Sequence, residues 1–363
     1  MTRTPRKVRP TRASREELRR RRRSFAALVG ISVSITAVLV LVFGGSGDDG
    51  GSADQAPSVV PAGDGQSELL AFSVTGSGHS LLAVVGTGGS RLPAVMVLPP
   101  SMQIVIPGQG EGSTDELRSL SGESMRIAVS NTIGSWIGRY AVTDLKHLGA
   151  LVDSVGGLTI DLPGTYTVGS TVLGPGETTF SGPELVTFLY VDAEDQEQRW
   201  TLALQAILSI STEFEGTDLI ESNDAAGAIE MLAAATETDV IVPETEIVAA
   251  RALVPQQPEF DSLVEATFGT TPPVRAIVQN GSGVPGVGES VARQLIPAGF
   301  QIVRSQNAES FDHDTTEIAA IQADHQDDAE RAREALGVGS VVVSEVPSTL
   351  ADITIVVGKD YRA

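Results

Sequence analysis

One short stretch of this 363-residue chain gathers the residue types that acid–base chemistry needs. The segment "VDAEDQEQR", residues 191–199, carries Asp192, Glu194 and Asp195 shortly before Arg199. Paired carboxylates can act as general acid and base when they lie on either side of a reacting group. A run of charges at the start of a helix also serves capping and solvation alone, and this alternative stays open. No catalytic residue is assigned.

Histidines and acids also occur together near the C-terminus. "FDHDTTE" and "QADHQDD" bring two histidines and six carboxylates into a short span: His313, His325, Asp312, Asp314, Glu317, Asp324, Asp327 and Asp328. Imidazole and carboxylate groups could hold a divalent cation. A solvated acidic loop leading into a helix explains the same residues. His79 and His147 stand apart in the sequence, and nothing indicates a Ser-His-Asp triad.

A glycine pattern, Gly281-x-Gly283-x-x-Gly286, follows a predicted strand and precedes a predicted helix. This is the context of a dinucleotide-binding fingerprint, but the acid expected about 20 residues later is replaced by "VRSQ". We therefore predict a structural role, in which these glycines let the chain turn tightly. Gly156 and Gly157 are predicted to end a helix in the same way.

Strand and helix patterns alternate along the chain, which predicts an α/β fold. Runs rich in Val, Ile and Leu with Gly or Pro at their ends favour strands: "ELLAFSV", "SLLAVVGT", "PAVMVLP", "MQIVIPG" and "GLTIDLPG". Apolar residues at helical spacing favour helices: "TDLKHLGALVDSV", "SGPELVTFLYV", "EQRWTLALQAILSISTEF" and "NDAAGAIEMLAAATET". After "FGTTPP", residues 268–273, a second alternation of strands and helices predicts a small C-terminal α/β domain.

The N-terminus predicts a membrane anchor. Residues 1–24 carry eleven Arg or Lys against two Glu, a charge of +9, which leaves −30 for the rest of a chain whose net charge is −21. Residues 25–43 contain no charge and are long enough to span a bilayer as a transmembrane helix. A cleaved signal peptide would have a shorter apolar region. The positive-inside rule places the basic tail in the cytoplasm and everything after residue 43 outside.

The domain organisation follows from these patterns. We predict a basic cytoplasmic tail at 1–24, a transmembrane helix at 25–43, a flexible linker at 44–67, an α/β domain at 68–268 and a C-terminal domain at 274–363. The acidic bulk makes nucleic acid an unfavourable partner. The absence of cysteine excludes disulfides, a thiolate nucleophile and zinc–thiolate sites.

Three stretches of residues 68–268 resemble the LytR-CpsA-Psr family of Gram-positive envelope phosphotransferases: "LGALVDSVGGLTIDLPG", "LGPGETTFSGPELVTFLYV" and "QRWTLALQAIL". Residues 274–358 resemble the LytR C-terminal domain through "VRAIVQNGSGVPGVG". The resemblance implies transfer of a wall polymer from a polyprenyl-pyrophosphate carrier to peptidoglycan. It also implies arginines on the pyrophosphate and acids on Mg²⁺. Phosphoryl transfer depends on neutralising phosphate oxygens, for which arginine is well suited.

The family's charged motifs are missing at the matching positions. "LPPSM" places Pro100 and Ser101 where the family has an Arg-Asp pair, and "GSGHS" replaces an Arg-Ser-Asp-Thr-like turn. The loop that is basic in the family reads "LYVDAEDQEQR" here and is acidic. Arg199 is the remaining candidate for binding phosphate.

We therefore expect a degenerate, non-catalytic module that binds or scaffolds in wall-glycopolymer assembly, with no firm cofactor. The predicted partners are the membrane and a polyprenyl-phosphate lipid or wall polymer, and the predicted location is the cell membrane with the bulk outside. The alternative is an active phosphotransferase in which Arg199 binds phosphate and Asp192, Glu194 or Asp195 holds Mg²⁺. A third hypothesis is a tethered structural protein whose C-terminal domain meets a partner protein or the wall.

Overall fold

The computed structural model describes seven segments of the chain: 68–76, 80–88, 92–189, 196–247, 253–255, 258–344 and 349–362. All of them belong to one compact unit, Pro57–Ala363. The predicted basic tail, transmembrane helix and linker, residues 1–67, lie outside the described residues. Within the described segments, no helix has the length and apolar character needed to cross a bilayer.

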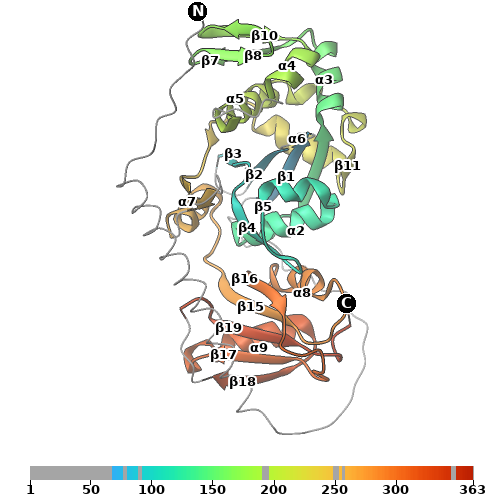
Figure 1. The fold of residues 1–363 in the computed structure, drawn as a ribbon, viewed down its shortest axis with the longest axis vertical. Helices are drawn as coiled ribbons and strands as arrows, with labels where there is room; N and C mark the ends of the chain where they lie inside the picture. Colours follow the sequence, from blue (N-terminus) through green and yellow to red (C-terminus); the bar gives the residue numbers. More distant parts are fainter. Residues whose placement is uncertain are drawn as a thin grey trace, which may run out of the picture. The chain divides into compact units, whose positions relative to one another are not determined.

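A six-stranded sheet forms the centre of the first domain (Figure 1). Its order is β11-β6-β1-β2-β3-β12, with bounds β1 Glu68–Thr75, β2 Ser80–Thr87, β3 Ala94–Leu98, β6 Arg139–Asp144, β11 Glu221–Ser222 and β12 Val240–Ile241. Strand β1 pairs antiparallel with β2 and parallel with β6. Its residues alternate between two apolar cores, because successive side chains of a strand point to opposite faces.

Helices cover both faces of this sheet, which explains why its strands read as continuous apolar runs. One core, which contains Phe72, includes residues of α3 Leu145–Ser154, α4 Gly182–Leu189, α5 Gln196–Ser209 and α6 Ala225–Ala234. The other, which contains Ala71, includes residues of α2 Gly122–Ile133 and α7 Glu259–Phe268. The first domain is thus a three-layer α/β/α structure.

Short strand pairs and 3₁₀ turns complete this domain. The antiparallel pairs are β4 Gln103–Ile106 with β5 Gly110–Ser113, β7 Leu158–Leu162 with β10 Gly176–Phe180, β8 Tyr166–Val168 with β9 Thr171–Leu173, and β13 Thr245–Ile247 with β14 Leu253–Pro255. The 3₁₀ turns are η2 Thr114–Ser119, η3 Ser211–Glu213 and η4 Gly216–Asp218.

The C-terminal domain has its own five-stranded sheet, in the order β16-β15-β19-β17-β18. Its elements are β15 Val274–Asn280, α8 Val287–Leu295, β16 Phe300–Asn307, β17 Glu317–Ile321, η6 Ala323–His325, α9 Gln326–Leu336, β18 Ser340–Ser344 and β19 Ile353–Val357. Strand β17 runs antiparallel to β19, whereas β15 lies parallel to both of its neighbours. Buried residues of α8 and α9 form one apolar core with alternate residues of the sheet.

The α/β class is confirmed, and the strands and helices predicted from the sequence occur at the predicted places. In the described segments, five α-helices and β-strands of five or more residues were not predicted: α2, β6, β10, α7 and β17. Strand β17 lies between the two His- and Asp-rich stretches that we interpreted as one acidic loop. Helix α2 was not predicted because nine of its twelve residues are buried, so its sequence shows no single apolar face.

Helix α2 is buried because it lies between the two sheets. Ile127 belongs to the core of the C-terminal domain, whereas Met125 and Val129 belong to the core of the first domain. Asn131, only 2% exposed, hydrogen bonds across this contact. Its Nδ2 donates to the carbonyl of Ile302 at 2.9 Å and its Oδ1 accepts from the Ile302 N–H at 2.7 Å. One side chain thus pairs both backbone groups of a β16 residue.

Replacing Asn131 should destabilise the whole unit. Asn131→Ala leaves the N–H and C=O of Ile302 unpaired in a buried site, and we expect a loss of about 2–4 kcal/mol in the free energy of unfolding. Urea denaturation followed by circular dichroism measures it. Gln326→Ala, which removes an exposed carboxamide from α9, is the matched control and should unfold like the wild type. An N131A protein with wild-type stability would contradict the proposed role of this contact.

Candidate functional site

The joint between β3 and β4 lies where the family resemblance places an Arg-Asp pair. The turn begins with a hydrogen bond from the Met102 N–H to the carbonyl of Pro99 at 3.2 Å. The Thr114 hydroxyl donates to the same carbonyl at 2.7 Å. Ser101, at φ +62°, donates its hydroxyl to a carboxylate oxygen of Asp115 at 2.7 Å. The polar groups of this turn are therefore bound to one another.

A further strand covers this joint. The N–H of Leu253, the first residue of β14, donates to the carbonyl of Ser101 at 3.2 Å, and Leu253 forms a bridge with Met102. Met102 is fully buried, and Pro99 and Pro100 are buried beside it. The position of the family's charged pair thus holds a closed turn whose own residues, Pro99, Pro100 and Ser101, carry no charge.

Arg199, the predicted phosphate ligand, is only 2% exposed. Its guanidinium donates to the carbonyl oxygens of Phe188 at 3.4 Å and Thr167 at 3.2 Å. It also lies over the rings of Phe188 and Tyr166, at 4.9 and 5.2 Å from their centroids. These contacts join α4 and α5 to the β8–β9 hairpin, so the observed role of Arg199 is to hold three elements together.

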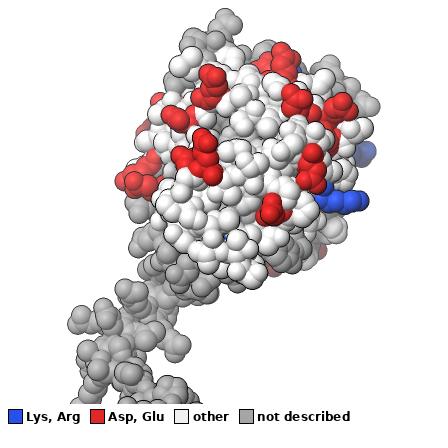
Figure 2. Space-filling view, turned by 90° about the horizontal axis from the view of Figure 1, so that it is seen from above, with Lys and Arg blue, Asp and Glu red and all other residues white. Residues whose placement is uncertain are grey.

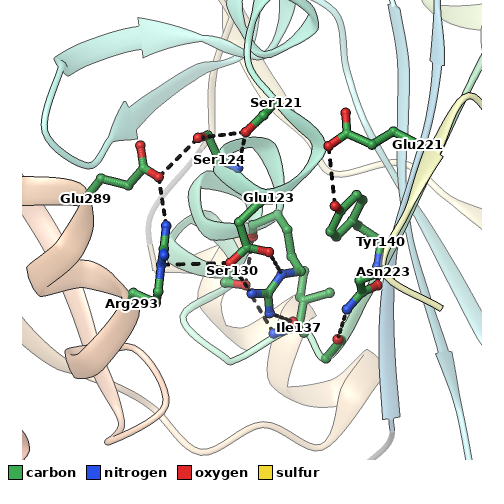
Figure 3. A network of polar contacts seen from close by, with 12 residues as sticks. Ser121, Glu123, Ser124, Ser130, Ile137, Tyr140, Glu221, Asn223, Glu289 and Arg293 are labelled. Carbon is green, nitrogen blue, oxygen red and sulfur yellow. Dashed lines mark hydrogen bonds and ion pairs between the residues drawn. The ribbon is translucent and has the colours of Figure 1, made fainter. Parts of the chain in front are cut away.

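Two further arginines of the first domain are bound to carboxylates. Arg126 on α2 forms a bidentate ion pair with Glu123 and donates to the carbonyl of Ile137 at 2.7 Å. Its guanidinium also stacks on the ring of Trp136. Figure 3 shows that Glu123 also faces Arg293 of α8, at 3.8 Å. The guanidinium of Arg126 is therefore the buried end of a network between the domains that reaches the exposed side chain of Arg293.

Arg139, at the start of β6, binds a different pair of acids. Its guanidinium contacts Asp224 and Glu68, and hydrogen bonds to these two carboxylates raise the pKa of Arg139. The hydrogen bond from Arg139 lowers the pKa of Asp224. Because Arg126, Arg139 and Arg199 have separate partners, these three guanidinium groups form no shared anion cradle.

Acidic residues dominate the polar surface of the first domain. Figure 2 shows a face on which acidic side chains surround an uncharged area, with basic groups at one edge. A cavity of about 620 Å³ is lined by Leu151, Ser154, Val155, Glu213, Glu215 and Asp218. An anionic pyrophosphate would be repelled there rather than held.

The predicted metal ligands Asp192, Glu194 and Asp195 lie outside the described residues. Within the described segments, no cluster of His, Asp and Glu side chains is suited to holding a metal ion. This finding includes the C-terminal histidines. His325 contacts Asp328 at 3.1 Å and Asp352 at 3.6 Å, whereas His313 lies against Gly281. Strand β17 lies between the two halves of that span in the sequence.

The predicted turn glycines occupy conformations that suit glycine. Gly156, Gly157, Gly283 and Gly286 have φ between +74° and +110°. Gly281 has no positive φ, but a Cβ there would lie 2.7 Å from the His313 ring. These five positions support the local backbone, and the loop 281–286 stands between β15 and α8 as the sequence predicted.

One close pair at the carboxyl end of β6, Asp144 and His147, was not predicted from the sequence. Asp144 caps α3 by accepting from the His147 N–H at 2.8 Å, and its Oδ1 lies 2.8 Å from His147 Nδ1. Partial burial opposes ionisation, but the hydrogen bonds from His147 outweigh it and lower the pKa of Asp144. The Asp-x-x-His spacing at a helix start was the available signal. His147 therefore serves as a hydrogen-bond partner of Asp144, the residue that caps α3.

Comparison with known proteins identifies the C-terminal domain. Residues 274–361 match the family model LytR_C, described as LytR cell envelope-related transcriptional attenuator. The predicted resemblance of this domain is confirmed. No curated protein matches the chain in sequence. The matched residues begin at β15 and extend past β19, and thus cover the whole five-stranded sheet.

Several solved structures resemble the chain at low sequence identity. Bacillus subtilis TagV is 13% identical, with 57% of this chain and 99% of that chain covered and a TM-score of 0.47. A LytR-Csp2A-Psr enzyme from Actinomyces oris is 15% identical, with 58% and 93% covered and a TM-score of 0.46. The LytR-CPS2A-psr family protein YwtF (TagT), solved with bound octaprenyl pyrophosphate lipid, is 14% identical, with 57% and 92% covered and a TM-score of 0.45. At these scores the likeness carries no conclusion about activity.

The contacts of Arg199 predict a structural effect of its removal. Arg199→Ala leaves the carbonyls of Thr167 and Phe188 without this donor, and we expect a loss of about 2–4 kcal/mol in the free energy of unfolding. Arg118→Ala, on an exposed side chain of η2, should change it by less than about 0.5 kcal/mol. Removing a ligand-binding cation usually leaves stability unchanged or raised, so an R199A protein as stable as the wild type would contradict a structural role.

Proposed function

We propose that this chain is a single-pass membrane protein of the cell envelope whose first domain binds or scaffolds in wall-glycopolymer assembly without catalysing transfer. The LytR_C match of residues 274–361 supports a cell-envelope role. The sequence resemblance of residues 68–268 to LytR-CpsA-Psr proteins supports a link to wall polymers. The uncharged span at 25–43 behind a basic tail supports the anchor and an extracytoplasmic location.

The observation that carries the non-catalytic part is the position of the positive charges. Between residues 68 and 268 the described segments contain five Lys or Arg side chains: Arg118, Arg126, Arg139, Lys146 and Arg199. Arg126, Arg139 and Arg199 contact carboxylates, carbonyls and aromatic rings of separate elements. Phosphoryl transfer needs several cations on one set of phosphate oxygens.

The cost of the missing charges is large. A carboxylate that faces a phosphate oxygen at 4 Å, where an arginine should be, costs up to about 4 kcal/mol at an effective dielectric of 20. The acids that line the cavity near α3 and η4 and the neutral β3–β4 turn both act against pyrophosphate binding. We therefore expect wall polymer or a protein partner, rather than a pyrophosphate, to be bound, and neither Mg²⁺ nor nucleic acid to be required.

Purified full-length protein should not cleave a polyprenyl pyrophosphate. We expect no release of phosphate from octaprenyl pyrophosphate, with or without Mg²⁺, because the described arginines of the first domain form no cluster that would neutralise the leaving group. A liquid-chromatography assay of the lipid phosphates measures it. Mg²⁺-dependent turnover would overturn the proposal and favour the alternative, an active phosphotransferase in which Arg199 binds phosphate and Asp192, Glu194 or Asp195 holds the metal.

The proposed topology is testable because the chain contains no cysteine. In intact cells, Ser52→Cys, placed after the uncharged span, should react with a membrane-impermeant maleimide. Thr11→Cys, within the basic tail, should react only after the membrane is permeabilised. Equal labelling of both variants in intact cells, or recovery of the full-length chain from the soluble fraction, would contradict the anchor.

A further inference from the structure

A small cavity lies at the carboxyl ends of β15 and β16, where the first domain meets the C-terminal domain. Its volume is about 120 Å³, and its polar side chains are Gln109, Asn280, Ser305, Gln306 and Asn307. The rest of the described lining is glycine and valine, so every described lining residue is uncharged. Open α/β sheets commonly bind ligands at the carboxyl ends of parallel strands.

The walls of this cavity are fixed by hydrogen bonds within the chain. Asn280 Oδ1 accepts from the Gly283 N–H at 3.0 Å, and its Nδ2 donates to the carbonyl of Val284 at 2.9 Å, which holds the glycine loop. Ser305 Oγ accepts from the Gly108 N–H at 2.8 Å, which ties the β4–β5 turn to β16. A preorganised wall reduces the ordering that a ligand would have to impose.

Close backbone contact keeps side chains out of the cavity. A Cβ on Gly288 would lie 2.6 Å from the Cα of Gly108, and a Cβ on Gly108 would lie 3.0 Å from the Glu289 nitrogen. Gly108 and Gly286 both have φ of +81°, which favours glycine. Larger residues at 108 or 288 would force the two domains apart, so these glycines maintain the contact between them.

Three carboxamides at this cavity are available to a ligand. Among the described residues, none forms a side-chain hydrogen bond with Gln109, Gln306 or Asn307, all of which are exposed. Each carboxamide offers two N–H donors and an oxygen acceptor in one plane. Hydroxyl groups also donate and accept, so neighbouring hydroxyls on one ring can pair with several carboxamides at once.

The absence of charge in the described lining decides between ligand classes. An anion would need a cation or an unopposed helix N-terminus, but the first turn of α8 carries the carboxylate of Glu289 and no described lining residue is Lys or Arg. A lipid chain would need apolar walls. The cavity is also smaller than the roughly 300–1,000 Å³ of pockets that enclose drug-sized ligands, which suits part of one ring.

We infer that this cavity is a binding site for an uncharged sugar residue, held by the carboxamides of Gln109, Gln306 and Asn307. The site lies at the junction of the domains and uses residues of both, so neither domain contains it alone. This inference does not rest on the proposed function, because a neutral sugar site is compatible with a catalytic or a non-catalytic first domain.

Calorimetric titration of the purified full-length chain tests the site. The probes are glucose, galactose and N-acetylglucosamine, with inorganic phosphate as the charged comparison. At least one sugar should bind saturably and phosphate should not. The combined variant Gln306→Ala, Asn307→Ala should weaken binding roughly tenfold or more, because two carboxamide contacts are lost. Gln326→Ala, with an exposed carboxamide on α9, should bind like the wild type.

Three results would overturn the site. The first is saturable binding of phosphate. The second is that none of the three sugars binds saturably. The third is that the double variant binds sugar with the same affinity as the wild type. Circular dichroism of each variant establishes that it is folded; both replaced side chains are exposed, so the fold should not change. An absence of lipid turnover, by contrast, would not affect this inference.

Discussion

Helix α2 is buried on two sides, and the arrangement of the two sheets depends on it. Its apolar residues pack into two separate cores, and Asn131 pairs the N–H and C=O of Ile302 on β16. Buried amide groups without partners would cost a large part of the net stability of a domain. The polar pairing therefore fixes where β16 can lie, and the neutral cavity beside Gly108 exists because β16 and α8 lie there.

In the part of the chain that the structure describes, Arg126, Arg139 and Arg199 bind groups of the chain itself. Arg126 joins α2 to Glu123 and the carbonyl of Ile137, and Arg199 joins α4 and α5 to a hairpin. Both side chains are buried, with Arg126 6% and Arg199 2% exposed, so their remaining N–H donors face the interior rather than solvent. The turn after β3, where the resemblance places an Arg-Asp pair, is closed by Thr114 and Asp115 instead.

The cavity between the domains, by contrast, has no charged residue in its described lining. Its side chains are carboxamides and a serine, and its glycines hold two backbones in contact. Such a site gains little from electrostatic attraction at a distance and depends on the directions of its hydrogen bonds. A chain with a net charge of −21 thus keeps one neutral, geometrically defined site among acidic surfaces.

The sequence by itself determined the α/β class, most strands, the helices with one apolar face and the loop glycines, because these follow from local periodicity and local backbone conformation. It also indicated that the family's basic motifs are missing. It did not reveal α2, whose burial on both sides removes the one-sided pattern, or β17, which is flanked by acids. Nor did it show that Arg199 is enclosed by Phe188 and Tyr166, or that Gln109 and Asn307 line the same cavity from two domains. Contacts between residues far apart in the chain are decided by packing, so only the tertiary structure could reveal them.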